Sequence, residues 1–296
     1  MASRLKQSRL PAALIRSLAV LPMFHLARFF LDQMFLVRLD NPRIRPVFFA
    51  HPLSLLCRTL NYFGRLFRHE YNDYALTRYA KYQRHHYGPD GRGYFSYDNI
   101  SDTDKIKLYG YPEGRLGSFI DAYGPILDYR NGDRFFDCGC GRGQNVKVLL
   151  DRFDRSEIRA LDISAEAVSI IDLATKGERV ATSSGDVTDP AILGTIADKS
   201  CDHAIISHVF SLLICPGLEK TKAARAHVVK ELLRIARKSV LIIDEPAAIS
   251  DHERFVIEQW NRGFFAEYLP RYFPAEGGRI YRMRAGLSEG ILFVCD

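Results

Sequence analysis

The sequence lacks the cysteine and histidine patterns that build disulfide frameworks or zinc sites. Its six cysteines include no C-x-x-C pair, and no group of its histidines has the spacing of zinc ligands. The chain has 296 residues, 47% hydrophobic and 26% charged, so there is enough apolar material for a sizeable core. These observations favour a protein of a reducing compartment without a metal site, and we expect a cytoplasmic location.

The N-terminal segment has little acidic character and no uncharged run long enough to span a membrane. Within the first 40 residues the longest stretch without a charged residue, 17–27, has 11 residues, whereas a membrane-spanning helix needs about 20. No acidic residue precedes Asp32, and no clear small-residue cleavage site follows the apolar run. The segment therefore suits either a transit peptide or a basic helix on a membrane surface.

Positive charge is concentrated in the N-terminal third. Residues 1–88 hold 14 Lys and Arg against 4 Asp and Glu, a balance of +10, whereas residues 89–296 hold 27 against 31, a balance of −4. A basic segment favours anionic partners such as phospholipid, nucleic acid or a phosphorylated substrate, or it serves only as a solubilising face.

Residues 12–37 are strongly apolar and carry one narrow polar stripe, formed by His25, Arg28 and Asp32 at helical spacing. Such a helix is covered by lipid or by protein. We therefore expect residues 1–38 to contact a membrane surface or a second copy of the chain, or to pack on their own domain. Tyrosines and basic residues interleave in 53–86, a pattern that stacks bases in some proteins but is more typical of amphipathic packing, and we do not expect a nucleic-acid partner.

From residue 113 onward, short apolar runs alternate with helical segments. This alternation predicts an α/β fold with a mostly parallel, doubly wound sheet, in which the last two strands form an antiparallel hairpin. Residues 1–112 are predicted as a mainly helical, basic extension and residues 113–296 as the second domain. The predicted strands are 134–138, 158–162, 179–182, 201–207, 239–244, 279–285 and 291–295.

The strongest local pattern is D-x-G-x-G-x-G, which runs from Asp137 to Gly143 between a predicted strand and a predicted helix. Glycines at alternate positions let the backbone turn tightly and approach a ligand closely. The helix that follows presents free N–H groups to an anionic group. A dinucleotide-binding G-x-G-x-x-G would need glycine at position 144, where this chain has Gln144. A purely structural turn is the alternative interpretation.

This pattern resembles the first motif of class I S-adenosylmethionine-dependent methyltransferases. The resemblance covers about residues 113–296 and implies a seven-stranded sheet completed by the C-terminal strand pair, S-adenosylmethionine as the cofactor, and methyl transfer as the activity. The cofactor-binding residues that it implies in this segment are Asp137, Gly139, Cys140, Gly141, Gly143 and Asn145.

A second segment fits the resemblance at the end of the next predicted strand. Asp162 lies 19 residues after Gly143, where a carboxylate can accept hydrogen bonds from the two ribose hydroxyls, and we place its neighbour Ile163 in the same site. Asp162 could instead cap the following helix, but Ser164 can fill that role alone.

Two more segments follow the third and fourth predicted strands. The resemblance implies that Gly185, Asp186 and Val187 contact the adenine, with a simple turn aspartate as the alternative. It also places Ser207, at the end of the fourth strand, beside the sulfonium.

His208 follows directly on the fourth strand and is our candidate for the catalytic base, since an imidazole can accept a proton near neutral pH. The alternative is that it orders a loop, in which case Glu245 at the end of the fifth strand is the next candidate. Tyr94, Phe95 and Tyr97 are candidates for a cover over the cofactor or for plain packing.

The sequence departs from the family at two places. Arg237, Lys238 and Ser239 stand where many relatives have Pro-Gly-Gly, and the Asn-Pro-Pro-Tyr tetrapeptide of nucleic-acid amino-methylating enzymes is absent after the fourth strand. We therefore expect a small-molecule acceptor, for example a lipid-linked or glycan hydroxyl, and an enzyme that is cytoplasmic or peripheral to a membrane. The alternatives are an RNA or protein methyltransferase and a binding module without turnover.

Overall fold

The computed structural model describes residues 80, 100–111, 114–244, 269–274, 276–286 and 288–296. Most of the predicted extension 1–112 lies outside these residues, including the contact segment 1–38 and the proposed cover formed by Tyr94, Phe95 and Tyr97. Glu245 also lies outside the described residues.

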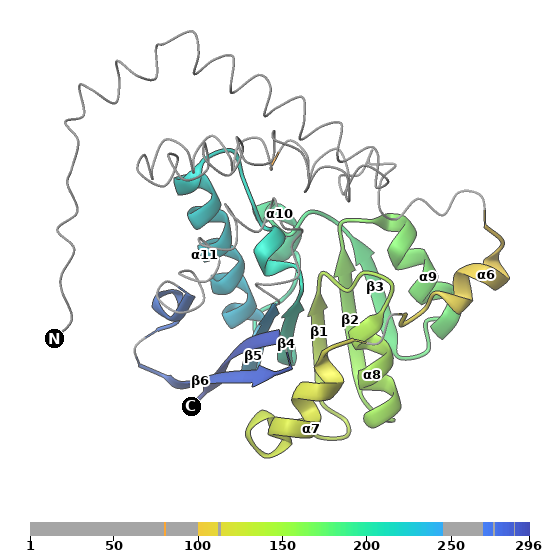
Figure 1. Ribbon diagram of the computed structural model, residues 1–296, viewed down its shortest axis with the longest axis horizontal. Coiled ribbons are helices and arrows are strands. Elements are labelled where there is room, and N and C mark those ends of the chain that lie inside the picture. The colour runs from red at the N-terminus through yellow and green to blue at the C-terminus, as the bar shows by residue number, and fades with distance from the viewer. Residues whose placement is uncertain (1–79, 81–99, 112–113, 245–268, 275, 287) are drawn as a thin grey trace, which may run out of the picture. The chain divides into compact units, whose positions relative to one another are not determined.

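Seven strands form one sheet in the order β3-β2-β1-β4-β5-β7-β6 (Figure 1). The pairings among β1 to β5 are parallel, whereas β7 runs antiparallel to both β5 and β6. The predicted α/β fold with a C-terminal antiparallel hairpin is therefore confirmed. The strands are β1 (Arg134–Cys138), β2 (Glu157–Asp162), β3 (Val180–Ser184), β4 (Cys201–Ser207), β5 (Ala236–Asp244), β6 (Gly278–Ala285) and β7 (Ser288–Cys295).

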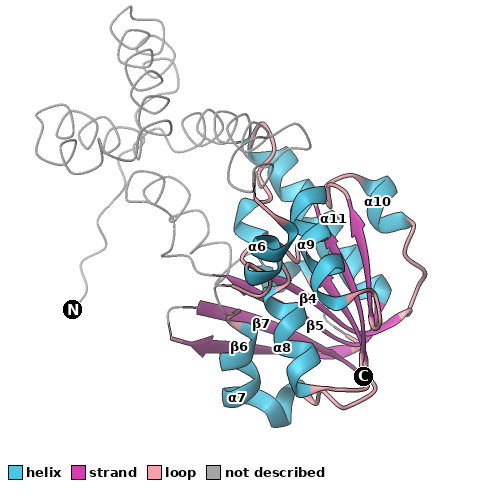
Figure 2. Ribbon diagram, turned by 90° about the vertical axis from the view of Figure 1, so that its right-hand side faces the viewer, coloured by secondary structure: helices cyan, strands magenta, loops and turns pink. Residues whose placement is uncertain are grey.

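Helices cover both faces of the sheet (Figure 2). One buried cluster joins α7, α8 and α9 to one face, and a second joins α10 and α11 to the other. Phe135 and Phe136 show why the strands are almost continuously apolar: consecutive side chains of β1 enter opposite clusters, and both are fully buried. The helices are α6 (Asp102–Lys107), α7 (Leu116–Leu127), α8 (Gln144–Arg152), α9 (Ala165–Thr175), α10 (Pro190–Gly194) and α11 (Leu218–Ile235), with short 3₁₀ helices η2 (Phe210–Leu212) and η5 (Leu269–Tyr272).

Short-range signals set the helix starts. Ser164 caps α9 by accepting a hydrogen bond from the backbone N–H of Ala167 over 3.1 Å, and Asp189 caps α10 in the same way through Ala191. Gly143, at φ +82°, begins α8 from the left-handed region that favours glycine. The turns that precede these helices all leave the carboxyl ends of parallel strands.

β1 lies at the point where the strand order reverses. It pairs with β2 on one side and with β4 on the other. The chain leaves the carboxyl end of β1 through residues 139–143, which contain Gly139, Gly141 and Gly143 and are called the glycine loop below. Open α/β sheets bind ligands at this position, outside the carboxyl ends of the strands. The candidate residues lie in the four segments that follow β1, β2, β3 and β4. The fold therefore places them together at the carboxyl ends of these strands.

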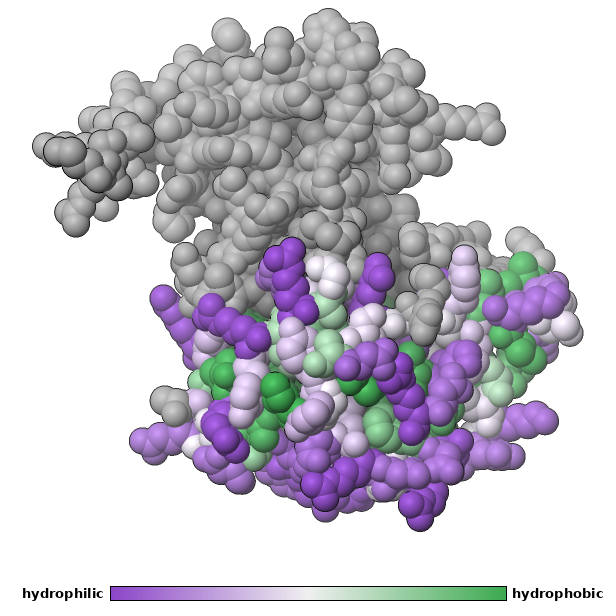
Figure 3. All heavy atoms as spheres, turned by 60° about the horizontal axis from the view of Figure 1, so that its bottom comes forward, coloured by the Kyte–Doolittle hydropathy of each residue, from purple (hydrophilic) through white to green (hydrophobic). Residues whose placement is uncertain are grey.

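The edge strand β6 and the outer surface are rich in charge. Arg279, Arg282 and Arg284 are exposed along β6, with one apolar neighbour, Ile280, that is 38% exposed. On the face drawn in Figure 3, hydrophilic side chains dominate the described residues, and hydrophobic ones lie in separate patches between them. Within the described part of the chain, no helix combines the length and apolarity needed to cross a bilayer.

Candidate functional site

The glycine loop after β1 is closely packed from two sides. Gly139, Gly141 and Gly143 all have positive φ, at +84°, +51° and +82°. A Cβ added to Gly139 would lie 2.4 Å from Cγ2 of Val209, and one added to Gly143 would lie 2.6 Å from a ring carbon of Tyr109. Glycine is therefore required at these two positions by both backbone conformation and space.

Asp162 ties the glycine loop to the start of α9. Its Oδ2 accepts a hydrogen bond from the N–H of Gly141 over 2.8 Å, and its Oδ1 accepts one from the N–H of Ser164 over 2.9 Å. Burial raises the pKa of Asp162, and these two bonds and one from the N–H of Ile163 oppose that rise. Ser164 caps α9 by itself, so Asp162 is not needed as the cap. Its ribose-binding role stays a prediction.

Asp137 is fully buried beneath the loop. Its Oδ1 accepts a hydrogen bond from Nδ2 of Asn145 over 3.0 Å, whereas its Oδ2 has no partner among the described residues. Burial raises the pKa of Asp137 to about 7, and the nearby negative charge of Asp162 adds to the rise. A buried carboxylate with an unpaired oxygen beside a glycine cradle suits a cationic ligand.

The carboxyl end of β3 joins the same edge. The N–H of Gly185 donates to the carbonyl of Asp162 over 2.9 Å, and a Cβ on this glycine would lie 2.9 Å from the side chain of Ile192. Asp186 is exposed, and its Oδ1 accepts hydrogen bonds from both the N–H and the hydroxyl of Thr188. Oδ1 of Asp186 thus stabilises a turn, as the alternative interpretation proposed. The predicted adenine contacts of Gly185, Asp186 and the buried Val187 stay a prediction.

The fourth segment places a histidine at the end of β4. Ser207 is 8% exposed, and His208 extends the strand pairing because its N–H donates to the carbonyl of Ile243 over 2.9 Å. His208 has φ +58°, a rare conformation for a residue with a side chain, and its Nε2 is buried without a hydrogen-bond partner among the described residues. Strained backbone of this kind is concentrated at functional sites.

Direct contacts join these segments into one site. The N–H groups of Gly139 and Cys140 both donate to the carbonyl of Leu161, which links β1 to β2. Val209 packs on Gly139 and so links β4 to β1. Cys140 is 2% exposed and burial raises the pKa of its thiol well above the ordinary value, so it contributes bulk rather than a nucleophile.

Two residues with clear roles near the site were not predicted from the sequence. The ring of Tyr109 wedges against Gly143, and the N–H of the next residue, Gly110, donates to the carbonyl of Arg142. Arg225 on α11 is fully buried. A signal for Arg225 exists in the sequence, because it falls on the buried stripe of α11 with Thr221, Val228 and Leu232 at helical spacing.

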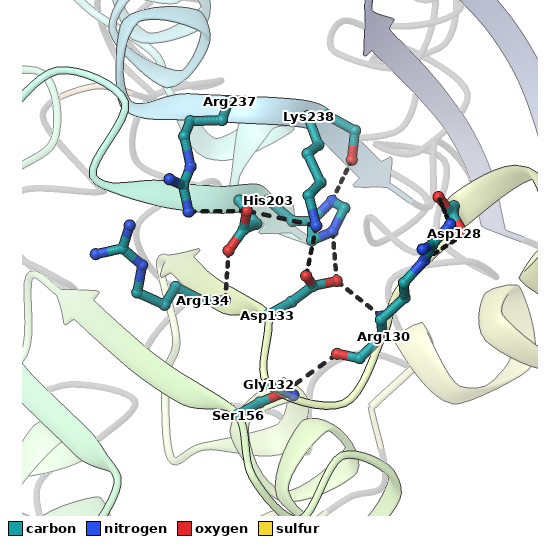
Figure 4. Close-up of polar contacts among 11 residues, drawn as sticks. Asp128, Arg130, Gly132, Asp133, Arg134, Ser156, His203, Arg237 and Lys238 are labelled. Carbon is teal, nitrogen blue, oxygen red and sulfur yellow. Dashed lines mark hydrogen bonds and ion pairs between the residues drawn. The ribbon is translucent and has the colours of Figure 1, made fainter.

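A second polar cluster lies at the amino ends of β1, β4 and β5, opposite the carboxyl ends that carry the candidate site (Figure 4). Nε2 of His203 lies 3.0 Å from Oδ2 of Asp133, and Nδ1 lies 2.7 Å from Oγ of Ser239. Lys238 donates to Asp133 over 2.6 Å, and Arg237 donates to Asp202 over 3.0 Å. The residues that replace the family's Pro-Gly-Gly therefore hold three strands together, away from the glycine loop.

Within the described residues, no cluster of three or more His, Cys, Asp and Glu side chains is arranged to hold a metal ion.

Comparison with protein families gave a direct match. Residues 136–243, which extend from β1 to the end of β5, match the family model described as a methyltransferase domain. A comparison with curated proteins found no match.

Solved structures with a similar fold include an S-adenosylmethionine-dependent methyltransferase from Aquifex aeolicus, 18% identical, with 67% of this chain and 100% of that chain covered and a TM-score of 0.44. Another is an O-methyltransferase family protein from Burkholderia thailandensis, 12% identical, with 71% and 64% covered and a TM-score of 0.48. The family match over residues 136–243, the seven-stranded sheet and the glycine loop at its reversal point show a class I S-adenosylmethionine-dependent methyltransferase domain in this part of the chain.

Proposed function

We propose that the enzyme methylates a hydroxyl group of a small-molecule acceptor and that His208 removes the proton of that hydroxyl. The observation that carries the proposal is the state of His208, which combines a left-handed backbone with a buried Nε2 that has no partner among the described residues. In the tautomer with its proton on Nδ1, Nε2 is a lone-pair acceptor that is ready for a donor from the substrate.

The residues around the glycine loop fit the cofactor. Asp162 has lone pairs left for the ribose hydroxyls after its backbone hydrogen bonds, and Asp137 offers a buried negative charge. We assign the remaining contacts to residues of the same edge: Gly139, Cys140, Gly141, Gly143, Asn145, Ile163, Gly185, Asp186, Val187 and Ser207. Bound S-adenosylmethionine supplies a methyl group on an electrophilic sulfonium.

The protein's own part is alignment and proton removal. His208 lies at the end of β4 beside Val209, which is packed on the cofactor loop, so a substrate hydroxyl bonded to Nε2 would be held close to that loop. Proximity of this kind supplies much of the rate in a displacement reaction, and general base catalysis adds about 10²–10⁴-fold.

The chemical class of the acceptor is proposed from the sequence. The apolar, basic segment 1–38 favours a lipid-linked or glycan acceptor at a membrane surface, or contact with a second copy of the chain. The alternative acceptors are RNA and protein, and either would be indicated if methyl transfer required an RNA or a peptide. RNA binding would reveal itself by a steep loss of affinity as salt is raised.

The test measures release of S-adenosylhomocysteine from the full-length enzyme with a panel of alcohols, phenols, lipid-linked sugars, amines, RNA and peptides. On the acceptor that is methylated, His208→Ala should lower turnover by about 10²–10⁴-fold and remove the acidic limb of the pH profile, with calorimetric cofactor affinity preserved. His227→Ala is the matched control, because His227 on α11 also has a buried Nε2 without a partner among the described residues. Normal turnover in His208→Ala, or an acceptor panel in which only RNA or peptide is methylated, would overturn the proposal.

A further inference from the structure

Arg225 is a fully buried arginine on α11, with 0% of its surface exposed. A buried guanidinium is costly unless the surrounding groups stabilise its charge. Burial lowers the pKa of Arg225 to about 9, so the side chain still carries its charge at neutral pH. Its neighbours among the described residues include the segment that follows His208, the end of β5 and Tyr272 of η5.

Two contacts fasten Arg225 to the 3₁₀ helix η2. Its Nε donates to the carbonyl of Leu213, the residue after η2, over 3.0 Å. Its guanidinium carbon lies 5.5 Å from the ring centre of Phe210, the first residue of η2, within the range of a cation–π contact. Phe210 is itself fully buried, so both ends of η2 are held by one side chain.

Asp244 links the same arginine to β5. It is the last residue of β5, is 2% exposed, and its negative charge favours the charged form of Arg225. The residue before it, Ile243, accepts the backbone hydrogen bond of His208. Arg225 therefore acts on both structures that flank His208, namely the end of β5 and η2.

The conformation of His208 needs such support. A residue with a side chain at positive φ costs about 1–3 kcal/mol and persists only where its surroundings hold it. Between His208 and η2 lies only Val209, whose side chain packs on Gly139 and whose carbonyl accepts from the N–H of Leu212 over 2.8 Å. A displacement of η2 would move His208 and the wall of the glycine loop together.

We propose that Arg225 is a positioning residue that braces η2 and thereby fixes His208 and Val209 against the cofactor loop. An effect of Arg225 on catalysis rests on the proposed role of His208 as the general base. The positioning of His208 and Val209 by Arg225 does not depend on that role. No other described arginine of α11 has this geometry. Arg234 donates to the carbonyls of Leu193 and Ile196 at the far end of the helix and is 25% exposed on its side chain.

The experiment uses the full-length protein with ¹³C-labelled histidine. The resonance of His208 is identified by its loss in His208→Gln, and that of His203 by its loss in His203→Gln. In Arg225→Met, the His208 resonance should shift, while the His203 resonance stays in place. Arg234→Met is the matched control: it also removes an arginine of α11 that bonds backbone carbonyls, and it should leave His208 unchanged.

Each outcome decides the proposal. An unchanged His208 resonance in folded Arg225→Met would overturn it. If Arg225→Met does not fold, Arg225→Lys decides, because lysine keeps a charge near Asp244 but lacks the Nε–H that bonds Leu213. A His208 shift in this variant supports the brace, and no shift overturns it. If His208→Ala keeps normal turnover, the proposed function fails while the resonance test of Arg225 stands.

Discussion

Asn145 donates a hydrogen bond from Nδ2 to Oδ1 of Asp137 over 3.0 Å and leaves Oδ2 of the same buried carboxylate without a partner among the described residues. The pKa of Asp137 in the free protein is raised to about 7 by burial and by Asp162. A cationic ligand favours the ionised form, so its binding lowers this pKa and releases a proton.

The first prediction concerns the proton that Asp137 releases when a cationic ligand binds. Affinity for S-adenosylmethionine should rise as the pH increases from about 6 to about 8 and then level off, because above pH 7 the carboxylate is already ionised. Calorimetry in two buffers of different ionisation enthalpy measures the proton released. Asp137→Asn should bind more weakly and without this pH dependence; an unaltered dependence in that variant would assign the proton to another group.

The second prediction separates space from backbone strain at the glycine loop. Gly139→Ala should destabilise the fold and abolish measurable cofactor binding, because its Cβ meets Val209 as well as a positive φ. Gly132→Ala is the control, since Gly132 has φ +93° but open space around its Cα. It should cost about 1–3 kcal/mol of stability and leave cofactor affinity intact. Equal cofactor affinity in the two variants would contradict the role of the Gly139–Val209 contact.

The third prediction concerns Asp162. Asp162→Ala should weaken S-adenosylmethionine binding by about 5- to 150-fold, the equivalent of about 1–3 kcal/mol, because the ribose hydroxyls and the N–H of Gly141 lose their acceptor. Asp189→Ala removes another aspartate that accepts a backbone hydrogen bond, at the start of α10, and should cost about 1 kcal/mol of stability without changing affinity. Unchanged affinity of the Asp162 variant in calorimetry would remove the ribose assignment.

The fourth prediction concerns the cluster at the amino ends of the strands. Burial lowers the pKa of His203, so the folded protein binds fewer protons there than the unfolded chain does. The stability linked to His203 is therefore present above about pH 6.5 and is lost as the pH falls below it. Urea unfolding at pH 5 and 7.5 should show a smaller pH effect in His203→Gln than in the parent. His227→Gln should behave like the parent, and a parent-like response of His203→Gln would refute the assignment.

The fifth prediction addresses residues outside the described structure. A chain that starts at Asn41 lacks the apolar segment with its narrow polar stripe, so it should lose liposome co-sedimentation or change its size in solution. If parent and truncated protein are both monomeric and neither binds liposomes, the segment packs only on its own domain.

The sequence predicted those parts of the fold that local patterns determine. β1 and β4 match the predicted ranges 134–138 and 201–207, because each is a buried apolar run between polar turns. β5 was predicted to begin at Ser239 but begins at Ala236. The charged residues Arg237 and Lys238 belong to the strand because they pair with Asp202 and Asp133 from distant segments, and no local pattern shows such pairs.

The site was predictable to the extent that its residues follow strand ends. Asp162 and His208 were found in this way, but the positive φ of His208 depends on contacts that only the folded chain makes. The burial of Arg225 was not predicted, for a different reason. Charged residues are rarely buried, so its position on the apolar stripe of α11 was outweighed by its residue type.

One carbonyl, that of Leu161, accepts hydrogen bonds from two successive N–H groups of the glycine loop, those of Gly139 and Cys140. The loop is thus ordered by the neighbouring central strand before a ligand arrives, and the entropy of ordering it is lost during folding rather than during binding. Amide hydrogens of these two residues should exchange with solvent only through opening of the central sheet. Association with the cofactor should accordingly be fast and should require little rearrangement of this loop.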